Sequence, residues 1–477
     1  MADQVINGVP LWPLSPNWRS PYSVSYEYKT DIFTSRSGKE QRRAQRTTPR
    51  KVVKFTVTRT KADARAFSRF LTLYQGPLIA IADSARFARL KAPIVATGTV
   101  FPVDNASAQW LNGGASIALY FGGAYQIGQV QSVDRDAHLV TLTAATGRAW
   151  PPGTKIHPIL RGRLDNQVGV KNYHDRTIDA DISFNIEPGV VQPDDTGSAF
   201  EVFNRREVFI FRPNMIQPVE GSYRRLIDQV DFGRGRIQTY LPVAFSTRTK
   251  QFQMLLPTQA DRQALVALFQ RMKGQRGEFY MPSYEDDFTP LAGAAGALTA
   301  TFAGTLLDEV FQADDVHRAV VLFDANGDRF YRSITASSND GVNTTLTTDI
   351  GWPADLVAGG IAINWLLVHR FAVDLLSIDC ITDEVGQAQL SVVSLEDLPV
   401  SETDSIFGSA GLDGAAEWVL RNWGFAFFVS RIADPFDYLV NTAYPYDTQS
   451  IGVRGVNNAA IGFDGIMSKY IKASAGK

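Results

Sequence analysis

The sequence has few residues of the types that bind metals or form covalent cross-links. Its 477 residues include one cysteine, Cys380, and five histidines, which are spread singly without a His-Glu-x-x-His run. One thiol cannot make an intrachain disulfide or a multi-thiolate metal site. The sequence therefore favours folding in a reducing compartment and predicts no metal or other cofactor. It also predicts that Cys380 is a small, buried, apolar side chain.

Long apolar runs and an excess of one charge are also missing. We find no uncharged apolar run of about 18 residues, and the first residues lack the basic and apolar regions of a secretion signal. We expect neither a membrane span nor export. Lysine and arginine number 47 against 49 for aspartate and glutamate, a formal net charge of -2. Bulk electrostatics therefore do not favour nucleic acid, and any such contact would be local.

The motifs of common catalytic sites are absent as well. The sequence has no Gly-x-Ser-x-Gly elbow, no dinucleotide-binding glycine motif and no phosphate-binding loop. Asp286 and Asp287 are adjacent and would point to opposite faces of a strand, so they do not form the facing pair of a glycoside hydrolase. Residues 324–328 resemble the start of a calcium loop, but Thr335 stands where a glutamate is needed, and we favour a hairpin turn. We predict that the chain is not an enzyme.

What the sequence does contain is an internal repeat. Thr60 and Asp63 recur as Thr258 and Asp261, 198 positions later, and each pair has the form of a capping box at the start of a helix. Apolar residues then follow at i, i+3, i+4 and i+7, as one helix face requires. They are Phe67, Phe70, Leu71 and Tyr74 in the first copy and Leu265, Leu268, Phe269 and Met272 in the second. Gly76 and Gly274 stand where a glycine would end each helix, so both copies predict one amphipathic helix of about four turns.

Further matches follow in the same order. The apolar run 117–121 matches 319–323, and each is followed by a hairpin-turn dipeptide, Gly122-Gly123 or Asn326-Gly327. Trp150 and Trp352, each followed by proline, are 202 positions apart. With 38 glycines, 23 prolines and 11% aromatic residues, the composition is typical of many short strands. The ordered set of matches indicates duplication of one β-rich module.

We therefore predict a mainly β (α+β) fold with two repeated modules. The first spans residues 1–190 and the second 200–398, separated by a linker at 191–199. Each has one flanking amphipathic helix and a small inserted all-β subdomain, at about 90–165 and about 290–370. Residues 399–477 form an extended C-terminal segment, rich in Gly, Ala and Asn, which we expect to become ordered against a neighbouring subunit.

A basic segment is the most unusual local feature. Eight lysines and arginines fall within 19 residues that contain one acid, Glu40; they are Arg36, Lys39, Arg42, Arg43, Arg46, Arg50, Lys51 and Lys54. One interpretation is a solvated loop and edge strand whose charges deter mispairing. A second is a subunit contact with an acidic partner such as residues 284–288, and a third is transient contact with DNA in a channel.

Residues 34–43 (TSRSGKEQRR), followed by an alternating strand, the capped helix and an apolar strand, resemble the opening of minor tail proteins of long-tailed bacteriophages. The second copy carries Arg234-Gly-Arg236 in place of the Glu-Gln-Arg stretch. The resemblance implies a tail-tube-like fold, in which a β-sandwich with a flanking helix assembles side by side into a ring around the tail channel. It implies no catalytic residues, and a location in the virion tail after synthesis in the bacterial cytoplasm.

The duplication suggests a symmetry for the assembled protein. Two equivalent modules per chain allow a homotrimer to present six modules to a sixfold tail tube and threefold symmetry to a hub or fibre. The expected partners are thus the chain itself, the tail tube and the hub or fibre proteins. A homohexameric distal tail ring without an adaptor role is one alternative. A host-surface carbohydrate-binding protein, with Trp110, Trp150 and Trp352 stacking on sugars, is another.

Overall fold

The fold is described from a computed structural model. It covers residues 5–6, 9–12, 15–35, 39–73, 78–108, 110–174, 176–187, 200–225, 227–231, 233, 235, 237–240, 246–313, 315–324, 326–357 and 361–397. The chain is mostly β, with 50% strand and 10% helix, in large antiparallel sheets. The prediction of a mainly β fold is confirmed. In the described part of the chain no helix is long and apolar enough to cross a membrane.

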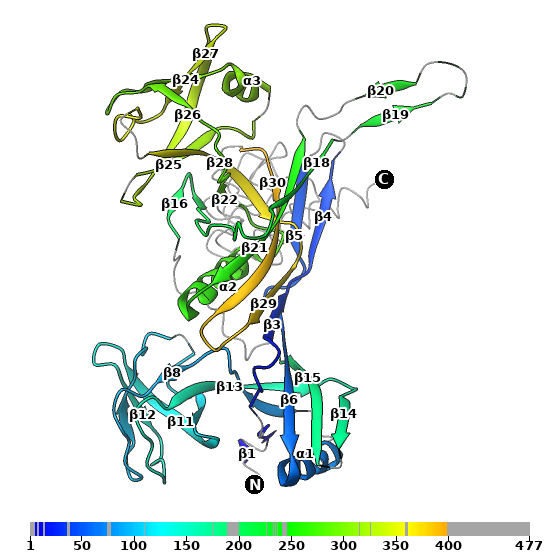
Figure 1. Cartoon of the computed structure of the whole chain (residues 1–477), viewed down its shortest axis with the longest axis vertical. Helices are drawn as coiled ribbons and strands as arrows, with labels where there is room; N and C mark the ends of the chain where they lie inside the picture. Colours follow the sequence, from blue (N-terminus) through cyan, green and yellow to red (C-terminus); the bar gives the residue numbers. More distant parts are fainter. Residues whose placement is uncertain are drawn as a thin grey trace, which may run out of the picture. The chain divides into compact units, whose positions relative to one another are not determined.

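The described part of the first half, residues 5–187, contains one helix and fifteen strands, most of which are labelled in Figure 1. The elements are β1 (Val5–Ile6), β2 (Val9–Pro10), β3 (Tyr22–Glu27), β4 (Thr30–Thr34), β5 (Glu40–Ala44), β6 (Arg50–Thr60), α1 (Lys61–Leu73), β7 (Ile79–Ala82), β8 (Ala88–Arg89), β9 (Val100–Pro102), β10 (Ser116–Phe121), β11 (Ala124–Asp134), β12 (Leu139–Leu142), β13 (Lys155–Leu164), β14 (Gly169–His174) and β15 (Thr177–Ile186).

The second half, residues 200–397, contains the remaining described elements. They are β16 (Val202–Phe203), β17 (Arg206–Glu207), β18 (Glu220–Arg224), β19 (Asp228–Val230), β20 (Gln238–Tyr240), β21 (Thr247–Leu256), α2 (Gln259–Met272), β22 (Phe279–Pro282), β23 (Pro290–Ala292), β24 (Thr299–Ala303), α3 (Leu306–Ala313), β25 (Ala319–Phe323), β26 (Arg329–Asn339), β27 (Asn343–Thr348), β28 (Ala362–Phe371), β29 (Leu375–Cys380) and β30 (Gly386–Ser394).

Eight strands from both halves form one continuous antiparallel sheet. Their order is β14, β15, β6, β3, β29, β30, β21, β18, so that β3 lies between β6 of its own half and β29 of the other (Figure 1). The strands alternate buried and exposed positions, as a sheet with one covered face requires. In β6 the buried positions are Lys51, Val53, Phe55 and Val57, and in β21 they are Lys250, Phe252, Met254 and Leu256. The main hydrophobic core beneath this sheet takes residues from both halves.

Each half has a second, smaller core in the region predicted as an insertion. One is built from residues between Ala88 and Ile156, and the other from residues between Phe288 and Leu367. Long strands connect these cores to the rest: Lys155–Pro158 of β13 pair with β10, whereas Ile159–Gly162 pair with β7. The pairing partner of β13 therefore changes between Pro158 and Ile159.

The prediction of an all-β insertion is wrong for the second half, because α3 lies within it. Leu307 and Phe311 of α3 are spaced i, i+4, so both point from one helix face into the small core. Asp308 and Glu309 occupy its first turn, where carboxylates interact favourably with the helix dipole. An amphipathic run of only eight residues gave too short a signal to be separated from the surrounding strands.

The two predicted helices are present, and they begin differently. Thr258 caps α2, and its hydroxyl and the Asp261 carboxylate form the predicted capping box. In the first half Thr60 ends β6, and Lys61 begins α1 with φ of 53°. The buried positions of β6 and β21 are 199 residues apart in sequence, whereas the apolar faces of α1 and α2 are 198 residues apart. The segment from the strand to the helix is therefore one residue longer in the first half.

The far ends of the helices also bear on the predictions. Gly76 lies outside the described residues. The α2 helix closes with Lys273 in the left-handed region and Gly274 at φ of 69°. A Cβ atom on Gly274 would clash with the Asp374 carboxylate and with Tyr28, so the position needs glycine both for its backbone angle and for this close approach.

Candidate functional site

The predicted basic segment forms a hairpin and the strand that follows it. Arg36 lies outside the described residues. Lys39, Arg42 and Arg43 belong to the β4–β5 hairpin region, Arg46 follows it, and Arg50, Lys51 and Lys54 are in β6. Lys39, Arg43, Arg50 and Lys54 are exposed, whereas Arg42 and Arg46 are half-buried and Lys51 is buried. Strand alternation thus divides the segment into an outward and an inward set.

Arg42 of the inward set connects the two halves of the chain. The Arg42 guanidinium donates to the Glu278 carboxylate and, at 3.0 Å, to the carbonyl of Arg276. Burial opposes ionisation of Glu278, but the charges of Arg42 and Arg206 outweigh it and lower the pKa of this carboxyl. Next to it, Glu40 accepts two hydrogen bonds of 2.8 Å from Arg370 of β28, a bidentate geometry that fixes orientation.

Lys51 makes the most deeply buried ion pair in the segment. Its ammonium lies 2.5 Å from Asp83, and both side chains are almost fully buried. Asp83 also accepts from the backbone N–H of Ala85 at 3.1 Å, and the Arg86 guanidinium is 3.8 Å away. Burial alone would raise the pKa of Asp83, but the charges of Lys51 and Arg86 prevail and lower it to about 2.

A similar ion pair lies in the second half of the chain. Lys250 is at a buried, inward position of β21, and its ammonium lies 2.9 Å from Glu285. Glu285 also accepts from Arg248 at 2.6 Å. Burial lowers the pKa of Lys250, and Glu285 offsets part of that effect. An inward-facing lysine in each alternating strand was a sequence signal for these pairs that the prediction missed.

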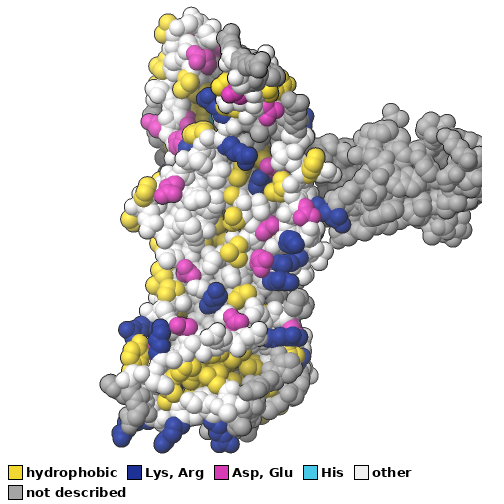
Figure 2. All heavy atoms as spheres, turned by 90° about the vertical axis from the view of Figure 1, so that its right-hand side faces the viewer, with side chains coloured by type: hydrophobic (Ala, Val, Ile, Leu, Met, Phe, Trp, Pro, Cys, Tyr) yellow, Lys and Arg dark blue, Asp and Glu magenta, His cyan; other side chains and the backbone are white. Residues whose placement is uncertain are grey.

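These contacts bear on the acidic partner proposed for the basic segment. Of residues 284–288, Glu285 is paired with Lys250 and Arg248, and Asp287 accepts from the hydroxyl of Ser283 and the backbone N–H of Trp365. Burial raises the pKa of Asp287. Two of the three acids in this stretch are therefore engaged within the chain, while the exposed Lys39, Arg43, Arg50 and Lys54 stay accessible to a partner. On the face shown in Figure 2, basic side chains are interspersed with acidic ones rather than joined in one continuous basic surface.

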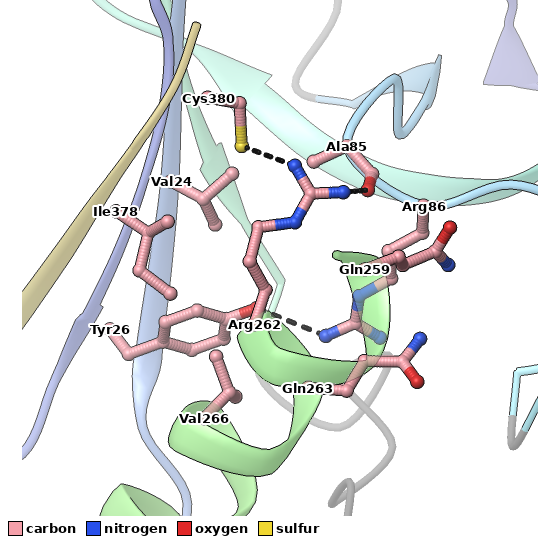
Figure 3. A pocket seen from close by; sticks show the side chains of 10 residues that line it. All are labelled: Val24, Tyr26, Ala85, Arg86, Gln259, Arg262, Gln263, Val266, Ile378 and Cys380. Atoms are coloured by element: carbon pink, nitrogen blue, oxygen red, sulfur yellow. Dashed lines mark hydrogen bonds between the residues drawn. The ribbon is translucent and has the colours of Figure 1, made fainter. Parts of the chain in front are cut away.

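Arg262 makes a second connection between the halves. Figure 3 shows its guanidinium between Cys380 and Ala85, and it donates to the Ala85 carbonyl at 3.1 Å and to the Cys380 sulfur at 3.2 Å. It also donates to the Asp383 carbonyl at 2.7 Å. Burial raises the pKa of the Cys380 thiol, and the residue is a free, buried cysteine, as predicted. The small pocket in Figure 3 is thus a packing joint, built from α2, β3, β29 and the loop after β7.

The tryptophans considered for sugar stacking are core residues. Trp150 is 2% exposed and Trp352 1%, and each lies in the small core of its own half, while Trp110 is 6% exposed. A sugar stacks on an accessible ring face, and none of these three rings offers one. Trp150 instead donates its indole N–H to Gln126 at 3.1 Å.

Two hairpin turns agree with the sequence prediction. Gly122 and Gly123, at φ of 57° and 82°, join β10 to β11. Asp324 accepts the backbone N–H groups of Asn326 and Asp328, at 2.9 and 2.7 Å, in the turn between β25 and β26. The Asp324 carboxylate therefore holds a turn, as favoured over the calcium loop.

No protein-family model and no curated protein sequence matches this chain.

Replacing Arg42 with alanine is expected to loosen the β4–β5 hairpin without unfolding the chain. The change removes the contacts to Glu278 and Arg276, which we expect to cost about 1–2 kcal/mol because the pair is only partly buried. Hydrogen exchange of residues 30–44 should become faster. Arg43→Ala is the matched control, since Arg43 is the exposed neighbour on the other face; equal exchange in the two variants would contradict the assignment.

Proposed function

We propose that the chain is a structural component of the tail tip or baseplate of a long-tailed bacteriophage. In this role it forms a ring around the tail channel and adapts a sixfold tail tube to a threefold hub or fibre. The observation that carries the proposal is that the two halves have equivalent strand pairings around equivalent helices, which supports two repeated modules. The resemblance of residues 34–43 to minor tail proteins supplies the biological setting.

The pairings correspond strand by strand. In the first half β6 pairs with β15, β7 with β13, β10 with β11 and β13, and β12 with β9 and β11. In the second half β21 pairs with β30, β22 with β28, β25 with β26 and β28, and β27 with β24 and β26. Each half thus contributes a helix-flanked sheet and an inserted hairpin unit in the same order.

Small irregularities recur too. The register shifts between Val130 and Ser132 in β11, and between Ile334 and Ala336 in the equivalent strand β26. A parallel bridge joins Leu11 to Ala80 in one half and Val208 to Tyr280 in the other. A bulge and an isolated bridge are not required by strand pairing itself, so their recurrence favours duplication over chance similarity.

Duplication suits a symmetry adaptor. Three chains with two equivalent modules present six similar surfaces to a sixfold tube, while the features that differ between modules repeat three times. The basic hairpin of the first half and α3 of the second are such differences. In this proposal the exposed Lys39, Arg43, Arg50 and Lys54 contact neighbouring proteins or DNA in the channel.

The role in a tail is tested by locating the protein in virions. Particles from the phage or prophage that encodes the sequence should contain this chain, and gold-labelled antibodies raised against residues 1–397 should bind at the tail end distal to the head. Labelling of the head, or absence of the chain from purified particles, would contradict the proposal.

A further inference from the structure

Among the described strands, β3 and β29 are the pair that joins the two halves of the chain. Six residue pairs connect β3 to β29, from Glu27 opposite Leu375 to Tyr22 opposite Cys380. Beyond the joint, the Asp374 carboxylate accepts from the backbone N–H of Thr30 at 2.5 Å and from its hydroxyl at 2.8 Å. An antiparallel joint with a carboxylate at its end is thus the main-chain pairing between the two halves in the described part of the chain.

The outer strands of the eight-stranded sheet are equivalent to the two strands of this joint. The strand β18 pairs with β21, the strand before the helix, as β3 pairs with β6. The strand β14 pairs with β15, the last strand of its half, as β29 pairs with β30. One end of the sheet therefore carries a β3-type edge and the other a β29-type edge.

Both outer edges are open in the part of the chain that the structure describes. All five residues of β18 are exposed, Tyr223 to 65%, and in β14 Val170 and Tyr173 are 40% and 56% exposed. Among the described strands, β18 pairs only with β21 and β14 only with β15. An open edge of this kind presents unpaired backbone N–H and C=O groups to another strand.

We propose that β18 of one copy pairs antiparallel with β14 of the next copy, and so repeats between chains the β3–β29 joint found within each chain. This inference gives the contact between copies in the proposed ring, and it rests on the proposed function for the number of copies. Transfer of the internal register through the equivalent strands places residues 217–222 of one copy opposite the region 165–172 of the next. In this register Val219, which directly precedes β18, corresponds to Val24 of β3, and Tyr223 corresponds to Tyr28.

The charges at the new joint are complementary. In the internal joint Asp374, in the turn before β29, meets the residues that follow β3. In the joint between copies the exposed Asp165, in the turn before β14, meets the end of β18, which carries Arg224 and Arg225. Arg225 occupies the place of Thr30, and Asp165 lies one residue from the place of Asp374, so opposite charges meet at this end of the joint between copies.

The two edges differ, so the joint between copies is heterologous. A heterologous contact gives a closed ring if its rotation closes and an open filament if it does not. Each chain uses its β18 edge for one neighbour and its β14 edge for the other. In a closed ring all of these edges are therefore paired. The proposed three-chain ring would thus be a continuous sheet of six modules.

Engineered disulfides test the joint directly. Directly opposed residues of an antiparallel pair have Cα atoms within about 4.5–5.5 Å, which suits a disulfide. Glu220→Cys is combined with Gln167→Cys, and in a second variant with Gly169→Cys, because the transferred register is defined to within two residues. Full-length protein is assembled at high concentration and oxidised, and the products are mapped by mass spectrometry. Glu220→Cys with Ser132→Cys is the control, since Ser132 is exposed but lies in the insertion.

We expect at least one β18–β14 combination to give covalent oligomers at least about tenfold above the control. Assemblies that form without this cross-link would overturn the β18–β14 joint and leave the proposed tail function intact. Cross-linked open filaments would support the joint and contradict the three-chain ring. A chain that neither assembles nor cross-links would overturn the joint.

Discussion

Replacing Lys51 with methionine is expected to lower the free energy of unfolding by about 3–5 kcal/mol, because it leaves the Asp83 carboxylate buried without its partner. Both side chains are removed from water, with 2% and 0% of their surfaces exposed. Urea unfolding followed by tryptophan fluorescence measures the change. The double variant Lys51→Met, Asp83→Leu removes both charges and should recover most of the loss.

Lys250→Met is the matched control, since Lys250 is also a buried, inward-facing lysine that is paired with a carboxylate. Its partner Glu285 is 45% exposed and keeps its contact with Arg248. Water and Arg248 therefore compensate the carboxylate, and we expect a loss of about 1–2 kcal/mol. An equal loss in the two single variants would contradict the burial argument.

The same pair gives a pH dependence with a defined sign. The folded-state pKa of Asp83 is lowered from 3.8 to about 2, so the unfolded chain binds this proton first as the solution is acidified. The stabilisation is present above about pH 4 and is lost as the pH falls towards 2, by roughly 2 kcal/mol. The difference in stability between the natural chain and Asp83→Asn should shrink over this interval. A constant difference would contradict the shifted pKa.

Replacing Trp150 with alanine is expected to cost about 3–5 kcal/mol, as for other large buried aromatic side chains. The loss should be local, since Trp150 belongs to the small core of the first insertion. Hydrogen exchange should rise in β10, β11 and β12 and stay unchanged in β21 and β30. Trp352→Ala should produce the equivalent change in β25, β26 and β27.

An exposed aromatic residue provides the control for the tryptophan variants. Phe33 is 69% exposed, and Phe33→Ala should change stability by less than about 0.5 kcal/mol. If Trp150→Ala left stability unchanged and abolished binding to a glycan, the core role of this residue would be wrong and the carbohydrate alternative would be favoured.

The sequence predicted the elements best where a pattern was long. The face of α2 is buried at Leu265, Leu268, Phe269 and Met272, and the capping box at Thr258 is formed, because a helix of this length repeats its apolar spacing several times. The match of 117–121 with 319–323 did not predict which side chains of the two runs face the core. Ile117 and Leu119 face the small core of the first half, and Val320 and Leu322, not Ala319, face that of the second. In a continuous apolar run the sequence does not reveal which alternate set points inward.

The joint between the halves was not predicted. The strands β3 and β29 are about 350 residues apart, and nothing in either sequence specifies its partner, since main-chain hydrogen bonds carry little sequence information. The ion pairs Arg42–Glu278 and Arg370–Glu40 depend on the same long-range placement. The basic segment was recognised from its composition, but its division into buried and exposed sets required knowledge of which face of β6 meets the core.

The symmetry of the assembled protein tests the central claim most directly. Full-length chains assembled into rings, alone or on purified tail tubes, are imaged by single-particle electron microscopy, and their mass is measured by native mass spectrometry. A closed ring of three chains, with six similar modules around one channel and a mass three times 52.5 kDa, is the expected result. A ring of six full-length chains would contradict the symmetry-adaptor role.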